Sequence, residues 1–245
     1  MWQKVYFDLD NTLFSYEYAF EKAIQDCYQD VVDEWIAQGV EFPYIPLEDW
    51  FDVFKFYSDF FWPAYEKKEL TQQEYRRKRY LETMKHFGLP SHVEEADRFH
   101  DKYYRQAVHY VKPYPGLYSL LEFLRGKKIE TGIITNGKTD VQKAKFAKLK
   151  LKNLIPEKNV YISEQVGLKK PDPALFKKVL GKVAPHEALF IGDSWEHDIV
   201  GALEAGWDAI FLNTRYGSRT TDHEPLAELF HLTQVLSYLQ EVLEK

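Results

Sequence analysis

Two aspartates that lie two positions apart, Asp8 and Asp10, follow the short apolar run 5–7. Such a run is typical of a buried strand in a parallel sheet, and open α/β sheets bind their ligands beyond the carboxyl ends of the strands. Two neighbouring buried acids are costly unless a cation or a proton compensates their charge. The pair therefore predicts a metal site with an acid/base task. An Asp-Asn-Thr turn that caps the next helix is the alternative.

Three further polar motifs follow or connect other predicted strands. They are Thr135-Asn136-Gly137, Lys169-Lys170-Pro171-Asp172-Pro173, and Gly192-Asp193-Ser194 with Asp198. In a doubly wound sheet whose first strand lies in the middle, the first and fourth strands are neighbours. Asp193 and Asp198 should therefore lie close to Asp8 and Asp10. A cluster of acids that offers only oxygen ligands suits Mg²⁺ rather than zinc.

The elements that must position these residues can be read from apolar patterns. Five short runs are predicted as strands: 5–9, 131–135, 160–162, 188–191 and 209–212. Helical spacing follows positions 116, 173 and 198, and a closing amphipathic helix is predicted over 232–243. Strands that alternate with helices predict an α/β fold, a doubly wound, mostly parallel sheet with helices on both faces.

Residues 15–112 do not alternate in this way and look entirely helical. Thr71 with Glu74, and Ser91 with Glu94, have the spacing of capping boxes that start helices. We therefore predict an all-helical domain of residues 15–112, inserted into a core domain of residues 1–14 plus 113–245.

Two side-chain clusters stand out in the helical segment. Eight aromatic residues lie between Trp50 and Trp62, and we expect some to form a bundle core and others to face a cleft and contact an organic leaving group. The basic run 76–79 covers the whole circumference of a helix, so a solvated surface is expected there rather than a binding stripe.

The composition is that of an ordinary globular protein, with 45% apolar and 29% charged residues among 245. A net charge of -6 argues against nucleic acid or an anionic membrane as the main partner. The single cysteine, Cys27, allows no internal disulfide and is expected to be buried. No signal-like or membrane-spanning run is present, so a cytoplasmic location is expected. The oligomeric state is left open.

The four motifs in this order, with a helical insert after the first strand, resemble the haloacid dehalogenase (HAD) superfamily of aspartate-nucleophile phosphohydrolases. The stretches 134–137, 162–164 and 170–171 look most like its nucleoside-monophosphate phosphatase branch. The resemblance implies a Rossmann-like core with a helical cap domain. It also implies a Mg²⁺-dependent phosphatase that acts on a small phosphorylated metabolite, and we expect a nucleoside 5′-monophosphate.

The resemblance assigns catalytic and phosphate-binding roles to five residues. Asp8 would attack phosphorus and form an aspartyl-phosphate, and Asp10 would protonate the leaving oxygen and then activate water. Thr135 and the backbone amide of Asn136 would hold phosphoryl oxygens. Lys170 would neutralise the charge on Asp8 and the phosphoryl group, and it is preferred to its neighbour at 169 because it adjoins the proline.

The resemblance also assigns the metal site. Mg²⁺ would be held by Asp8, the backbone carbonyl of Asp10 and Asp193. Thr12 would support the loop after the nucleophile, and Asp198 would order the site through water or through the motif lysine.

Of three alternatives, one is disfavoured and two remain open. Dehalogenases of this superfamily lack the second Asp of the first motif, so Asp10 argues against cleavage of a carbon–halogen bond. A sugar-phosphate mutase would share every core residue with a phosphatase. A non-catalytic scaffold is the third reading, because fold alone does not prove function.

Overall fold

The computed structural model describes residues 1–244. The chain forms two compact units: Met1–Tyr16 joined with the chain from Val111 onward, and Glu17–Tyr110. We call these the core unit and the helical unit.

Six parallel strands form the sheet of the core unit, in the order β3-β2-β1-β4-β5-β6. They are β1 (Lys4–Phe7), β2 (Glu130–Thr135), β3 (Val160–Ile162), β4 (Ala188–Gly192), β5 (Asp208–Leu212) and β6 (Ala227–Leu229). The five predicted strands are all present, and the doubly wound parallel sheet is confirmed. β6 was missed because its sequence, Ala-Glu-Leu, contains no apolar run. It lies at the edge of the sheet and is only half-buried.

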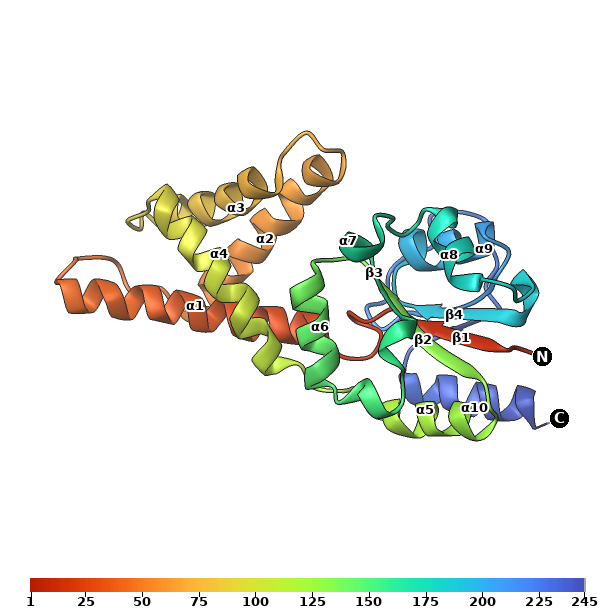
Figure 1. Cartoon of the computed structure of the whole chain (residues 1–245). Coiled ribbons are helices and arrows are strands. Elements are labelled where there is room, and N and C mark those ends of the chain that lie inside the picture. The colour runs from red at the N-terminus through yellow and green to blue at the C-terminus, as the bar shows by residue number, and fades with distance from the viewer. Residues whose placement is uncertain (245) are drawn as a thin grey trace. The chain divides into compact units, whose positions relative to one another are not determined.

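Helices cover both faces of this sheet (Figure 1). One face carries α5 (Leu117–Gly126) and α10 (Leu232–Leu243), and the other carries α8 (Pro173–Leu180) and α9 (Gly201–Glu204). The unit also contains α6 (Thr139–Lys148), α7 (Ser163–Val166), the 3₁₀ turns η2 (Leu151–Asn153), η3 (Glu157–Asn159) and η4 (Pro185–Glu187), and a π-helical turn, η5 (Trp195–Val200). Because both faces are covered, the central strands are buried and read as continuous apolar runs.

The helical unit contains α1 (Tyr16–Gln38), α2 (Leu47–Glu66), α3 (Gln72–His86), α4 (Val93–Ala107) and the 3₁₀ turn η1 (Val108–Tyr110). Its core is built around Trp50, whose ring stacks on Tyr28 at 4.2 Å and on Phe54 at 5.1 Å between centroids. By contrast, Phe56 and Phe60 are 60% and 64% exposed. The aromatic run is therefore divided between core and surface, and the expected contact with a leaving group stays a prediction.

One of the two predicted capping boxes is present. The Thr71 hydroxyl accepts from the Glu74 amide at 3.2 Å, and the Glu74 carboxylate accepts from the Thr71 amide at 2.8 Å. The box at Ser91 is wrong, because α4 starts one residue later, with His92 as its N-cap. The next acid, Glu95, accepts from the Tyr80 hydroxyl at 2.6 Å, and this contact joins α4 to α3.

The solvated surface expected for the basic run is wrong at Arg79. Its side chain is buried, with Nη2 3.2 Å from His100 Nδ1. Its guanidinium lies over the rings of Phe54 and Tyr75, at 5.0 and 4.9 Å. Four successive helical residues point in four directions, so one of them faces the bundle interior. Burial, followed by the nearby Arg79 charge, lowers the pKa of His100 well below its usual value.

Cys27 is buried and free, as predicted. Within residues 1–244, every helix is too short or too polar to cross a membrane.

Candidate active site

Three carboxylates meet at the carboxyl ends of β1 and β4, which are neighbouring strands. Asp8 follows β1, Asp193 follows β4, and Asp198 lies on η5. Each is buried, and each offers a carboxylate oxygen that lies within 4.8 Å of the other two. The expected meeting of first-strand and fourth-strand acids therefore occurs for these three residues.

Lys170, in the connection between α7 and α8, lies between two of these acids. Its Nζ is 2.5 Å from Asp8 Oδ1 and 2.6 Å from Asp198 Oδ1, whereas Lys169 is exposed. The side chain of Asn136 holds the Lys170 backbone: Oδ1 accepts from the amide and Nδ2 donates to the carbonyl, both at 2.9 Å. Sequence reasoning gave Asn136 only a backbone role, so this clamp was missed.

Asp198 is fixed from two sides. Its second oxygen accepts from the Ser194 amide at 2.9 Å, so both oxygens are engaged. A Cβ added at Gly192 would lie only 2.6 Å from the Asp198 Cβ, so β4 ends on the one residue type that leaves room for this carboxylate.

Two side chains contact the Asp193 carboxylate. Thr12 Oγ1 lies 3.5 Å from one oxygen, and Arg215 Nη2 lies 2.7 Å from the other. Thr12 is fully buried, whereas Arg215 is about half exposed on the loop after β5. Thr12 thus links the loop after Asp8 to the acid after β4.

Burial and mutual repulsion raise the pKa of two of the acids. Desolvation raises the pKa of Asp8 well above its usual value, against the opposing charge of Lys170. Desolvation and the neighbouring Asp198 raise the pKa of Asp193 to about 7. Burial lowers the pKa of Lys170, but the carboxylates of Asp198 and Asp8 outweigh this effect and raise it. Three buried acids around one buried ammonium leave an excess of negative charge, which a cation or a proton would balance.

Asp10 was expected to join these acids, but its carboxylate turns towards α6. Oδ1 lies 2.6 Å from Lys145 Nζ, and Oδ2 accepts from Gln142 Nε2 at 2.9 Å. The chain turns directly after Asp10, where Asn11 adopts a left-handed φ of 56°. Gln142 also donates to Thr135 Oγ1 at 2.6 Å. Both α6 residues escaped sequence reasoning; the available signal was two polar residues three positions apart on the helix after the Thr135 motif.

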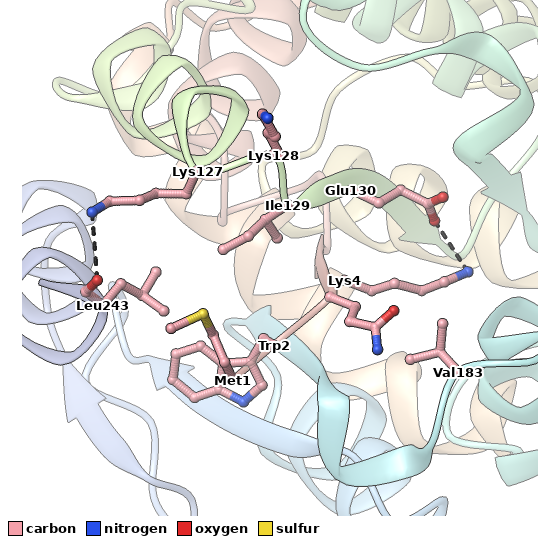
Figure 2. Close-up of a pocket in the computed structure, with 10 residues that line it drawn as sticks. Met1, Trp2, Lys4, Lys127, Lys128, Ile129, Glu130, Val183 and Leu243 are labelled. Atoms are coloured by element: carbon pink, nitrogen blue, oxygen red, sulfur yellow. Dashed lines mark hydrogen bonds and ion pairs between the residues drawn. The ribbon is translucent and has the colours of Figure 1, made fainter. Parts of the chain in front are cut away.

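A pocket of the core unit lies at the other end of the strands, near the start of β1 and β2 (Figure 2). Two of the lysines that line it are engaged within the chain: Lys4 pairs with Glu130 at 3.1 Å, and Lys127 donates to the Leu243 carbonyl at 3.4 Å. None of the motif residues lines this pocket. The motif residues and this pocket therefore lie at opposite ends of the strands.

Known proteins resemble this chain over most of its length. The family model for haloacid dehalogenase-like hydrolases matches residues 47–212. Pyrimidine 5′-nucleotidase PynA of Streptococcus pneumoniae is 28% identical over 98% of this chain and 96% of its own length. Pyrimidine 5′-nucleotidase YjjG of Escherichia coli is 25% identical over 96% of this chain and 98% of its own.

Among solved structures, the putative HAD-hydrolase YfnB of Bacillus subtilis, bound to magnesium, matches with a TM-score of 0.80. It is 22% identical and covers 97% of this chain and 98% of its own, which shows a likeness of fold. The resemblance to the superfamily and to its nucleotide phosphatase branch is confirmed by these matches. The chain belongs to the haloacid dehalogenase-like hydrolase family.

Proposed function

We propose that this hydrolase is a Mg²⁺-dependent phosphatase that forms an aspartyl-phosphate on Asp8 and acts on a nucleoside 5′-monophosphate. The observation that carries the proposal is the buried Asp8 carboxylate, 2.5 Å from Lys170 Nζ. It lies at the carboxyl ends of the strands, where α/β proteins bind ligands. Lys170 offsets the charge that would otherwise repel an anionic phosphoryl group from an anionic nucleophile.

The reaction proceeds in two displacements. An Asp8 oxygen forms a bond to phosphorus while the bond to the leaving oxygen breaks, and Asp10 gives that oxygen its proton. A water molecule then attacks phosphorus and passes a proton to Asp10, which releases inorganic phosphate and restores the Asp8 carboxylate. Thr135 and the Asn136 amide are assigned to the phosphoryl oxygens, whose charge grows in the transition state.

The donor set fits a hard divalent cation. Asp8 and Asp193, with the backbone carbonyl of Asp10, would hold Mg²⁺, since oxygen ligands and an excess of buried negative charge favour it. Asp198 is assigned a positioning role because both of its oxygens are already engaged. When bound, the cation would supply positive charge next to the phosphoryl oxygens.

The substrate assignment has separate support. Two relatives that match nearly the whole chain are pyrimidine 5′-nucleotidases. Exposed rings such as Phe56 and Phe60 in the helical unit offer flat apolar surface of the kind that stacks on a base. A cap role for residues 15–112 belongs to the same proposal.

The test is release of inorganic phosphate by the purified chain, with and without Mg²⁺. The substrates are uridine, cytidine, adenosine and guanosine monophosphates, glucose 6-phosphate and 4-nitrophenyl phosphate. We expect Mg²⁺-dependent release, the highest kcat/KM with the pyrimidine nucleotides, and loss of activity in Asp8→Asn. Asp222→Asn, which changes an exposed acid in the same unit, should retain full activity.

Three outcomes would contradict parts of the proposal. If no ester released phosphate at any Mg²⁺ concentration, the phosphatase assignment would fail. Equal kcat/KM for glucose 6-phosphate and the nucleotides would remove the nucleotide assignment alone. Interconversion of sugar phosphates without phosphate release would favour the mutase alternative.

A further inference from the structure

We propose that Gln142 and Lys145 are positioning residues that hold the Asp10 carboxylate in place for proton transfer. The inference rests on the proposed phosphatase function. It extends that function to a second Asp–Lys pair, Asp10 with Lys145, whose aspartate lies two residues after Asp8.

Each oxygen of Asp10 has its own donor on α6. Lys145 Nζ lies 2.6 Å from Oδ1, and Gln142 Nε2 lies 2.9 Å from Oδ2. Residues three apart on a helix share a face, so both donors come from one rigid element. Two donors on two different oxygens fix both the rotation and the tilt of a carboxylate. The Asp10 side chain nevertheless stays 26% exposed, so its carboxylate remains accessible.

The orientation of the Gln142 amide links this pair to the predicted phosphate-binding motif. Its nitrogen also lies 2.6 Å from Thr135 Oγ1 and 3.1 Å from the Asn136 carbonyl. A flipped amide would set its oxygen against Asp10 Oδ2, acceptor against acceptor, so the nitrogen must face inward. The Thr135 hydroxyl then accepts and keeps its own proton for donation to a phosphoryl oxygen.

This orientation leaves Gln142 Oε1 buried without a hydrogen-bond partner among residues 1–244. A buried unpaired acceptor is destabilising, so the hydrogen bonds of the amide nitrogen must outweigh this cost. The amide keeps this orientation because the Asp10 carboxylate and the Asn136 carbonyl both lie on that side and can only accept. The unpaired oxygen therefore shows that the acceptors around the nitrogen set the orientation of this amide.

Lys145 is restrained as firmly. Its side chain is buried, and its ammonium lies 5.0 Å from the centroid of the Tyr16 ring and 5.8 Å from that of Phe14. Ring faces attract an ammonium and leave it little freedom to leave the carboxylate. Asp10 is thus clamped between a fixed cation and a fixed amide.

The experiment separates positioning from a merely structural pair. Lys145→Met and Gln142→Met remove the donors at similar volume, Lys145→Arg restores a cation, and Lys148→Met makes the same change at an exposed site on the same helix. Single-turnover rates of phosphoryl transfer are measured with 4-nitrophenyl phosphate, phenyl phosphate and uridine monophosphate. Melting temperatures are recorded for every variant.

A poor leaving group needs its proton most, so loss of positioning should depend on the leaving group. We expect about 100-fold slower transfer from uridine monophosphate in Lys145→Met, under tenfold from 4-nitrophenyl phosphate, and KM within about threefold. Gln142→Met should follow the same pattern and Lys145→Arg should recover part of the rate. In an Asp10→Asn background, Lys145→Met should add less than about threefold, because the group it positions is gone.

The inference is overturned if the rates fall equally for all three esters, or if the loss adds in full to that of Asp10→Asn. If Lys145→Met does not fold, Gln142→Met decides by the same criteria. A wild-type chain that releases no phosphate would instead refute the proposed function, and the positioning role with it. Activity of the wild type alongside unchanged rates in Lys145→Met and Gln142→Met would refute the positioning role alone.

Discussion

The two units bury positive charge in different ways. In the core unit, Lys170 lies among three buried acids that outnumber it, and the pKa values of Asp8 and Asp193 are raised. In the helical unit, Arg79 lies over aromatic rings, and its hydrogen-bond partners are the neutral groups of Ser58, Tyr75 and His100.

The difference indicates what each charge is for. Several like charges close together work against folding, so the acidic cluster of the core unit is better explained by a role in binding or catalysis than by a role in stability. The Arg79 guanidinium is held by ring faces and neutral groups, although its Nε has no hydrogen-bond partner among residues 1–244, so we assign it to the packing of the helical unit. Substitutions in the core cluster should therefore affect activity before stability, and substitutions around Arg79 should do the reverse.

The largest effect is expected at the nucleophile. Asp8→Asn should lower kcat by at least about 10⁴-fold, because no other group can form the covalent intermediate. The same change removes a buried negative charge from the crowded cluster, so the metal-free protein should melt at the same or a higher temperature. Phosphate release and thermal unfolding in chelator measure the two effects. A lowered melting temperature with modest activity loss would reverse the comparison between the units.

The next effect is a pH dependence of stability in the core unit. Asp193 has an unfolded pKa near 3.8 and a folded pKa of about 7, so the folded state binds more protons between these values. Its stabilising contribution is complete below the lower value and is lost as pH rises through about 7. The loss is at most about 4 kcal/mol, from ~1.4 kcal/mol per pKa unit.

Denaturant unfolding in chelator from pH 4 to 8 measures this slope. Asp193→Asn should flatten it, and Mg²⁺ should counteract it by binding the ionised acids. A slope that is unchanged in Asp193→Asn would show that another group carries the pH dependence.

A smaller effect is expected in the helical unit at Arg79. Arg79→Met should lower the free energy of unfolding by about 1–3 kcal/mol, because Ser58, Tyr75 and His100 lose a buried hydrogen-bond partner. Turnover of 4-nitrophenyl phosphate should change by less than about tenfold. Chemical denaturation and steady-state kinetics on one preparation test both parts. If activity were lost while stability was kept, Arg79 would belong to the site.

The smallest effect is expected at the start of α3. Thr71→Ala removes one half of a capping box and should cost about 1 kcal/mol, with kcat unchanged. Ser91→Ala is the matched control, since Ser91 does not cap α4 and its loss should cost little. Equal destabilisation by the two changes would contradict this assignment of the caps.

The parts of the fold that were predicted are those with a strong local signal. Central strands read as apolar runs because helices cover both faces, whereas β6 has only three half-buried residues and gives no such run. Thr71 sits at a true helix start, but the start of α4 is shifted, and its Glu95 is engaged by Tyr80 from another helix. Local spacing cannot report a contact made by a residue fifteen positions away.

The site shows the same division. Asp8, Lys170 and Asp193 follow strands or precede a proline, so motif position places them near one another. Gln142 and Lys145 look like ordinary polar residues of a surface helix. They are buried only because the face of α6 that carries them packs against Asp10. Arg79 was misread for a similar reason, because a basic run does not reveal which of its members faces inward.

Gly192 illustrates how loss-of-function data on this protein should be interpreted. It has no side chain and performs no chemistry, yet any larger residue would collide with the Asp198 side chain that steadies Lys170. In a saturation mutagenesis library, position 192 should be as intolerant as position 8. Mutational intolerance alone would then suggest that Gly192 is a catalytic residue, although its role is to leave room for the Asp198 side chain. Only chemical rescue or the kinetics of a variant can distinguish the two roles.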